Sequence, residues 1–286
     1  IDIDQAIEVQ EGMIISEIFE KKGEPFFRVL EEKISLLSLK KKNSVISLGG
    51  GAFLNKKIQK EVLKLVLEHL KNHHNDSYEL KTDTIESKRN NRLYYYDDFQ
   101  DPLELASLLI QEDLIIMKPK ENIFYLDSAS LCAPTRWSLR EKFQQSLSEL
   151  HRSVPGYKGK IDSRVNTIFT NLPDQKIFER YNWSIFDSPE LFQPVGNKSL
   201  VEIKNTQPDK LFIRVERQTI RRLDYSRAVL FAVRVHVNPI TDIINNKKAI
   251  SDLIQAIQNL EEDMKTYKVI EPFEENLIKW LKSKNE

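Results

Sequence analysis

The chain has 286 residues, a length that allows one large or two modest folded domains. Of these residues, 40% are hydrophobic and 30% are charged, which is typical of a folded globular protein. Its 43 acidic and 43 basic residues give a formal net charge of zero, which argues against a general nucleic-acid-binding protein. No apolar run approaches the roughly 20 residues that cross a bilayer. The single cysteine excludes an internal disulfide framework and an iron–sulfur cluster held by this chain alone, and it indicates a reducing, cytoplasmic setting.

The first 55 residues have the pattern of a parallel α/β sheet. Residues 1–4 predict the end of a buried strand, and residues 16–39 predict two helices separated by a Gly-Glu-Pro break. Residues 44–48 predict a short buried strand that runs into three glycines, and strand, helix, strand and glycine turn is the order found in such sheets. Because the chain starts at Ile1 without Met, we expect its natural N-terminus to lie upstream.

This segment contains, in order, the motifs Asp-x-Asp, Gly-Glu-x-x-Phe-Arg and Gly-Gly-Gly, and it resembles the middle of a shikimate kinase. The resemblance implies that Asp2 lies near magnesium, that Asp4 accepts the substrate's hydroxyls and that Arg28 pairs with its carboxylate. It also implies that backbone N–H groups approach the substrate ring closely at three glycines, Gly49, Gly50 and Gly51. The phosphate-binding loop and the arginine-bearing lid are missing. We therefore interpret residues 1–56 as a partial shikimate kinase-like fragment with a vestigial site and no kinase activity.

Residues 57–286 predict an α+β domain with a central antiparallel sheet. Apolar residues at helical spacing and alternating residues indicate helices at 57–71, from about 102, 138–150, near 247–265 and near 273–283, and strands at 114–118, 122–127, 211–219 and 228–237. Ser138 followed by Glu141 predicts a capping box at the start of the third of these helices. His151 would then share its apolar face at the last turn, before Pro155-Gly156 ends it.

Four segments concentrate the polar and aromatic groups of this domain: 131–138, 150–157, 181–184 and 214–219. Together they resemble the haem-dependent oxidative N-demethylase family over about residues 60–286. The resemblance implies a PAS-like sheet that binds haem, with helices packed on one face. It implies a subunit that oxidises a small secondary amine with oxygen, receives electrons from a reductase whose partner chains carry flavin and an iron–sulfur centre, and passes a one-carbon unit to a folate-binding partner.

His151 is the predicted axial ligand of a haem b, because a helix-end histidine on an apolar face can present a neutral imidazole to the iron. The alternative for His151 is an imidazole stabilised by the helix C-terminal dipole. His236, which projects from the last predicted strand, is the rival ligand, and its alternative is a hydrogen-bonded core histidine.

Four arginines are candidates for the haem propionates or for a polar pocket beside the iron, since two propionates require two cations: Arg136, Arg214, Arg217 and Arg234. Ordinary ion pairs, such as one between Arg214 and Glu216, are the alternative. Glu216 is the candidate for holding an ammonium substrate, with Arg217 beside it. Trp137 and Trp183 are expected to pack against the core or the haem edge.

Three further side chains have simpler explanations. His69 and His73 could hold a metal, but a solvated helix end explains them better. Cys132 could ligate haem as a thiolate, but a buried structural cysteine is the better interpretation. Three other interpretations of the whole chain stay open: a PAS-type haem sensor without turnover, a shikimate kinase with its P-loop upstream, and a chimaera joined near Asn55 with neither activity.

Overall fold

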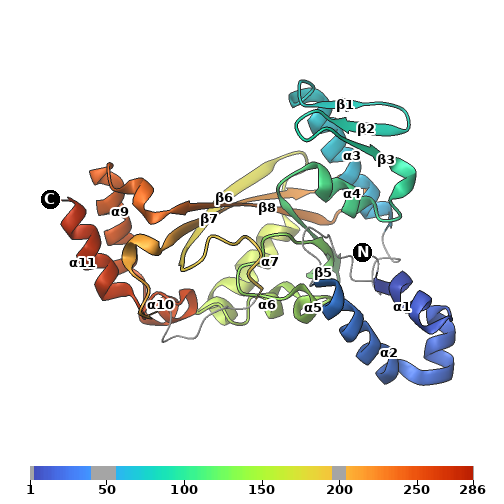
Figure 1. The fold of residues 1–286 in the computed structure, drawn as a ribbon, viewed down its shortest axis with the longest axis horizontal. Coiled ribbons are helices and arrows are strands. Elements are labelled where there is room, and N and C mark those ends of the chain that lie inside the picture. The colour runs from blue at the N-terminus through green and yellow to red at the C-terminus, as the bar shows by residue number, and fades with distance from the viewer. Residues whose placement is uncertain (1–2, 40–55, 195–203, 286) are drawn as a thin grey trace. The chain divides into compact units, whose positions relative to one another are not determined.

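The computed structural model describes residues 3–39, 56–194 and 204–285 (Figure 1). The chain divides into two compact units, Ile1–Gln111 and Glu112–Glu286. The first unit contains α1 (Ile3–Glu11), α2 (Ile15–Leu39), α3 (Lys56–His73), β1 (Tyr78–Leu80), β2 (Thr84–Ser87), β3 (Arg92–Tyr95), a 3₁₀ turn (Tyr96–Asp98) and α4 (Pro102–Leu109). The second contains β4 (Asp113–Lys120), β5 (Ile123–Ser130), α5 (Leu139–Lys142), α6 (Leu147–Leu150), a π-type turn (Tyr157–Ile161), α7 (Asp162–Thr170), β6 (Ile177–Phe186), a 3₁₀ turn (Pro208–Lys210), β7 (Phe212–Arg222), β8 (Val229–Pro239), a 3₁₀ turn (Ile240–Ile243), α9 (Lys247–Gln258), α10 (Glu262–Lys268) and α11 (Glu274–Asn285).

The N-terminal segment is helical where a strand was expected. Helix α1 begins at Ile3, so the predicted strand end at residues 1–4 is wrong for Ile3 and Asp4. The segment is helical because helical geometry lets Ile7 pack with Ile18 and Phe27 of α2 in a buried cluster. The predicted break in the following helix is confirmed, because Gly23 has φ 79° and ψ 164° inside α2.

Most of the shikimate-kinase-like motif lies outside what the structure describes. Asp2, the strand predicted at 44–48 and the three glycines 49–51 fall among the undescribed residues, and the side chain of Arg28 does as well. Asp4 lies on α1 rather than at the end of a strand.

The rest of the first unit combines two helices with a small sheet. Helix α3 is confirmed, with Ile58, Val62 and Leu70 buried along one face. The antiparallel sheet β1-β2-β3 was not predicted, because its strands are only three or four residues long. Helix α4 begins as predicted at Pro102, where the missing N–H costs nothing.

A five-stranded antiparallel sheet in the order β5-β4-β8-β7-β6 forms the centre of the second unit. The α+β class and the strands β4, β5, β7 and β8 are confirmed, and β7 and β8 pair antiparallel as expected. The sequence analysis did not identify β6 or α7. Strand β6 carries exposed residues over its first half, so the alternation that indicates a half-buried strand is absent there.

The register divides the polar residues of the sheet between its two faces. Side chains directly opposite each other in antiparallel strands lie on the same face, and successive residues alternate. Glu216 is opposite Asn182 and Val235, whereas Arg217 is opposite Tyr181 and Arg234. We call the face that carries Glu216 the inner face, because α6 and α7 pack on it through Leu147 and Phe169, respectively (Figure 1). The opposite face is called the outer face.

The helix predicted over 138–150 is instead two single turns. Helix α5 ends where Phe143 adopts extended backbone geometry and Gln144 adopts φ 60°. The capping box is therefore not formed by Ser138, whose side chain makes no cap. It is formed by Ser146 and Glu149 at the start of α6, with both reciprocal hydrogen bonds present.

Three C-terminal helices cover one end of the sheet. The helix expected over 247–265 is two helices, α9 and α10, because α9 ends at Gln258 and Glu261 has extended backbone geometry. Buried side chains of α9 and α11, including Ile250, Ile257 and Leu277, pack with Ile185 of β6 in a second apolar cluster.

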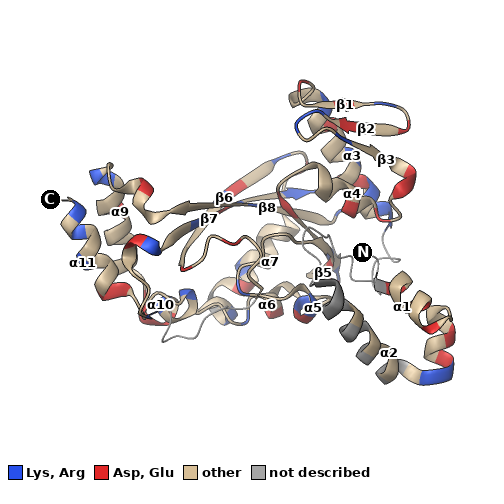
Figure 2. Cartoon of the chain, in the orientation of Figure 1, with Lys and Arg blue, Asp and Glu red and all other residues tan. Residues whose placement is uncertain are grey.

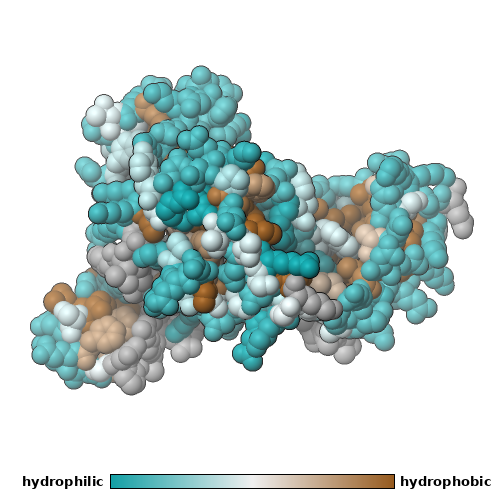
Figure 3. Space-filling view, turned by 180° about the vertical axis from the view of Figure 1, so that it is seen from behind, coloured by the Kyte–Doolittle hydropathy of each residue, from teal (hydrophilic) through white to brown (hydrophobic). Residues whose placement is uncertain are grey.

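Charged residues of both signs are interspersed along the elements (Figure 2). The surface seen in Figure 3 is mostly hydrophilic, with small hydrophobic patches. No helix among the described residues is long and apolar enough to cross a membrane.

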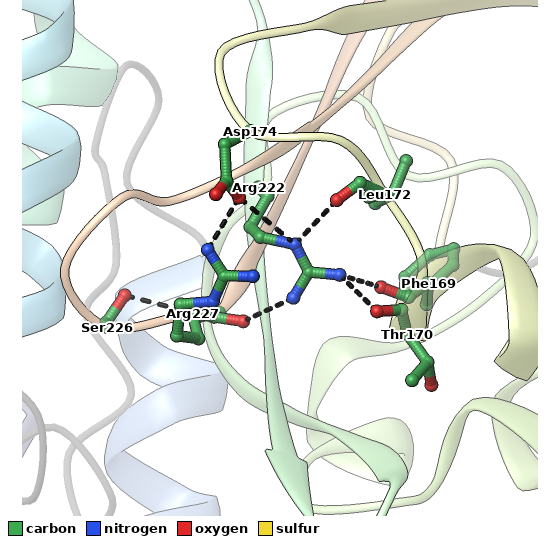
Figure 4. A network of polar contacts seen from close by, with 8 residues as sticks. Phe169, Thr170, Leu172, Asp174, Arg222, Ser226 and Arg227 are labelled. Atoms are coloured by element: carbon green, nitrogen blue, oxygen red, sulfur yellow. Dashed lines mark hydrogen bonds and ion pairs between the residues drawn. The ribbon is translucent and has the colours of Figure 1, made fainter.

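Arg222, at the end of β7, fixes the C-terminus of α7 (Figure 4). Its side chain is buried and donates to the carbonyl oxygens of Phe169 (2.7 Å), Thr170 (2.7 Å) and Leu172 (2.9 Å). The last carbonyls of a helix have no partner inside the helix. A buried guanidinium therefore satisfies them and joins α7 to the sheet.

We expect Arg222→Met to lower the free energy of unfolding by roughly 2–4 kcal/mol, because three buried carbonyls lose a charged donor. Chemical denaturation measures the loss. Arg227→Met is the matched control: Arg227 shares Asp174 with Arg222 but is 51% exposed, so the loss should stay below about 1 kcal/mol. Equal losses in the two variants would contradict the capping role.

Candidate functional site

The inner face of the sheet carries a continuous polar network centred on Glu216. Its carboxylate accepts hydrogen bonds from Thr135 Oγ1 (2.6 Å), Gln218 Nε2 (2.8 Å) and Asn182 Nδ2 (3.3 Å). These partners come from the loop after β5, from β7 and from β6. Three donors from three segments hold the carboxylate in one orientation.

Arg214 joins this network to two loops. The side chain is fully buried and donates from Nε to Thr135 Oγ1 (3.1 Å) and from its terminal nitrogens to the carbonyls of Ala133 (2.7 Å), Leu191 (3.1 Å) and Glu190 (3.3 Å). Burial lowers its pKa, and the charges of Glu216 and Asp113 oppose that shift. The expected Arg214–Glu216 pair is thus bridged by the Thr135 hydroxyl.

Lys268, at the end of α10, extends the network on its other side. Its Nζ donates to Asn182 Oδ1 (3.1 Å) and to the Trp183 carbonyl (2.5 Å). Burial lowers the pKa of Lys268, and the nearby Glu216 carboxylate acts in the opposite direction. The lysine therefore places a cation next to the amide that contacts Glu216.

Arg136 lies beside the same helix end in an unusual backbone conformation. Its φ is 55°, a left-handed value that costs free energy for a residue with a side chain. The guanidinium donates to the Lys268 carbonyl (3.0 Å) and lies over the Phe186 ring at 4.3 Å. Burial lowers its pKa. Such strain is retained when the surroundings require the side chain in that place.

Asp113 anchors the loop that carries Thr135 and Arg136. The carboxylate is buried and accepts hydrogen bonds from the backbone N–H groups of Cys132 (2.6 Å) and Ala133 (3.1 Å). Burial is nevertheless the larger effect and raises the pKa of Asp113 to about 6. The anchor therefore changes charge near neutral pH.

His151 is the C-cap residue of α6, at the position predicted for it relative to Leu147. Its Nδ1 lies 2.9 Å from the Leu147 carbonyl oxygen. A proton on Nδ1 donates to that carbonyl, which leaves the lone pair on Nε2. Burial lowers the pKa of His151, so the ring is neutral at neutral pH.

This arrangement fits an iron ligand. Metal-binding histidines commonly donate their second ring nitrogen to a carbonyl, which fixes the tautomer and the ring. Partly buried apolar side chains also pack against the buried cluster that contains Leu147 and supply an apolar surface for a flat group: Leu131, Trp137, Leu139, Leu150, Phe231 and Val235. Trp137 therefore has the packing position predicted for it.

Arg180 lies close enough to act electrostatically on both His151 and the Lys268 side of the Glu216 network. Arg180 is opposite Gln218 in the register, on the inner face, and its charge lowers the pKa of both His151 and Lys268. His151 and the polar network therefore belong to the same face of the sheet.

The other predicted site residues lie on the outer face. Arg217 pairs with Glu179 at 2.5 Å, and both side chains are exposed. Arg234 lies 3.8 Å from Glu112, and His236 is exposed opposite Val215. The structure does not bring these three residues together with Glu216, because neighbours in a strand project to opposite faces.

Three other side chains named as metal or haem candidates lie outside the network. Cys132 is exposed, so the expectation of a buried structural cysteine is wrong. His69 and His73 lie on the exposed end of α3 with their rings 4.8 Å apart. Among the described residues, no group of three or more His, Cys, Asp and Glu side chains is placed to bind a metal ion directly.

The residues that connect the site were not predicted from the sequence: Asp113, Thr135, Asn182, Gln218 and Lys268. Asn182 and Thr135 lie inside the motifs that were singled out, so their position was available. Lys268 was not, because only the fold brings α10 next to β6.

The sequence profile of a family described as "haem-dependent oxidative N-demethylase, alpha subunit-like" matches residues 23–278. The chain belongs to this family. The description supports a haem-dependent, oxidase-like role, and the term alpha subunit is consistent with an assembly of several subunits.

The N-terminal part also resembles curated shikimate kinases. The kinase of Rhodococcus jostii is 43% identical over 63 residues, 22% of this chain and 37% of the kinase. That of Bacillus subtilis is 50% identical over 60 residues, 21% and 32%, and that of Aquifex aeolicus is 46% identical over 54 residues, 19% and 32%. The chain thus spans about a third of the length of these relatives.

We predict that the stability of the protein depends on the ionisation of Asp113. Its folded pKa of about 6 lies above its usual value of 3.8, so its contribution is full below about pH 4 and is lost as the pH rises through 6. Relative to Asp113→Asn, the wild type should gain roughly 2–3 kcal/mol between pH 7 and pH 4. Denaturation of both proteins across this range measures the difference, and parallel pH profiles would contradict the raised pKa.

Proposed function

We propose that the protein is the haem-binding subunit of an oxidative N-demethylase that acts on a small secondary amine with oxygen. The observation that carries the proposal is the contact between His151 Nδ1 and the Leu147 carbonyl oxygen at 2.9 Å. A carbonyl oxygen can only accept, so the proton belongs on Nδ1 and the lone pair of Nε2 remains for iron. Membership in the family supports a haem-dependent role. The helices on the inner face of the five-stranded sheet support a PAS-like fold.

The haem proposed here is a b-type haem, held by His151 and by the apolar residues around Leu147. When bound, it supplies the oxidising chemistry. Arg136 is the described cation best suited to a propionate, because it reaches the site on strained backbone and is held there by the Lys268 carbonyl and the Phe186 ring. Arg214 instead has four polar contacts within the protein and serves to fix the loops.

Glu216 is the group proposed to hold the substrate ammonium. Its three donors fix the carboxylate while leaving part of its acceptor capacity, since two oxygens offer about four lone-pair positions. A secondary ammonium would be oriented by this contact. The outer-face residues Arg217, Arg234 and His236 are not assigned to the site.

Oxidation of an amine by oxygen requires electrons that this chain is not proposed to supply itself. We propose a partner reductase that carries flavin and an iron–sulfur centre, in line with the description as an alpha subunit. Oxygen consumption that depends on both an amine and a reductase would separate this enzyme from a haem sensor with the same pocket. Kinase activity is not proposed, because the motif Gly-x-x-x-x-Gly-Lys-Ser/Thr does not occur in these 286 residues.

Titration of the purified protein with haemin tests haem binding and the ligand. We expect a Soret band in the wild type that His151→Ala abolishes or shifts to the blue, because the axial nitrogen is lost. His236→Ala is the matched control and should leave the band unchanged, since His236 is exposed on the outer face. A folded wild type that stays colourless would contradict haem binding, and the opposite pattern in the two variants would move the ligand to His236.

Amine-dependent turnover with a reductase tests Glu216. Glu216→Gln should keep the haem spectrum and lower the rate about 10- to 150-fold, the effect of losing a charge-assisted contact of roughly 1.5–3 kcal/mol in the transition state. Glu179→Gln removes an exposed carboxylate in the first half of β6 and should leave the rate unchanged. An unchanged rate in Glu216→Gln would remove Glu216 from the site.

A further inference from the structure

Tyr157 lies directly against His151, yet the proposed function gives it no role. The two rings are stacked, with centroids 4.6 Å apart and planes inclined by 12°. The tyrosine is 5% exposed. It follows Gly156, whose φ of 68° turns the chain back towards the histidine.

The phenol hydroxyl is buried and has no hydrogen-bond partner among the described residues. A buried hydroxyl without a partner destabilises a protein, because water solvated it in the unfolded chain. Phenylalanine would fill almost the same space without that cost. A tyrosine hydroxyl carries its proton at neutral pH, so the group is able to donate.

The other contacts around this pair do not use the hydroxyl. Asp162, whose charge acts on Tyr157, accepts hydrogen bonds from Ser148 Oγ (2.6 Å) and Asn166 Nδ2 (3.2 Å). The bond from Ser148 joins α6 to α7 across the loop between them, and the bond from Asn166 lies within α7. The surrounding structure therefore fixes the tyrosine without satisfying its polar atom.

We propose that the Tyr157 hydroxyl is a ligand-binding group, a hydrogen-bond donor to an oxygen acceptor on the haem group that His151 binds. The inference rests on the proposed function, because the haem is the ligand in question. The acceptor is either a propionate oxygen or a small ligand on the iron. Tyr157 then orients the bound group, while the stacked ring holds the imidazole in its plane.

The unfolding of the apoprotein tests the first half of the proposal without haem. Tyr157→Phe removes a polar atom that has no partner, so its melting temperature should rise by roughly 2–8 °C. Tyr181→Phe is the matched control, because its exposed hydroxyl bonds to Glu179 at 2.9 Å and its loss should change little. A lower melting temperature for Tyr157→Phe would show that the hydroxyl already has a partner, such as a bound water, and would overturn the proposal.

Haemin titration tests the second half. Tyr157→Phe should bind haemin about 5- to 10-fold more weakly than the wild type, the loss of one net hydrogen bond, while keeping the His151-ligated Soret band. The stretching frequency of carbon monoxide on the reduced haem identifies the acceptor: a shift in Tyr157→Phe indicates a donor to the iron ligand, and no shift indicates a propionate.

The outcomes separate the two proposals. A wild type that binds no haemin defeats the proposed function. A wild type that binds haemin with the same affinity and the same carbon monoxide frequency as Tyr157→Phe defeats the role of Tyr157 alone. Loss of the Soret band in Tyr157→Phe would show that the phenol itself ligates the iron and would overturn its assignment as a donor.

Discussion

The site depends on one buried cation. Arg214 is fully excluded from solvent and has no carboxylate within salt-bridge distance among the described residues. Backbone carbonyls of two loops and the Thr135 hydroxyl solvate it instead. A buried charge is tolerated only when its donors are satisfied, so the two loops must close over β7 for the guanidinium to be stable. That closure brings Thr135 to Glu216.

The same constraint explains how a rigid site arises on an open sheet. Asp113 holds the loop after β5 by the backbone N–H groups of that loop, and Lys268 joins α10 to Asn182 of β6. Each contact links segments that are far apart in the sequence. The network therefore forms only in the folded chain, and it orients one carboxylate on the face where His151 also lies.

Four of the five central strands and the helices α2, α3, α4 and α11 could be predicted from the sequence, because alternation and helical spacing report burial directly. His151 and Glu216 were named as candidates from the sequence, since motifs with unusual polar residues stand out. It was harder to predict which polar residues of the sheet share a face. Arg217 and Arg234 look equivalent to Arg214 in the sequence, and only the register separates them. The prediction of one helix over 138–150 was wrong, because Gln144 adopts a left-handed conformation that interrupts the helix. The apolar residues on either side of Gln144 nevertheless keep helical spacing in the sequence.

The central claim is that His151 offers its Nε2 to a haem iron on the inner face. Resonance Raman spectroscopy of the reduced, haem-reconstituted protein tests it most directly, because an iron–histidine bond has its own stretching band. We predict that band in the wild type, its persistence in His236→Ala and its loss in His151→Ala. A reconstituted His151→Ala protein that retains the same iron–histidine band would contradict the account.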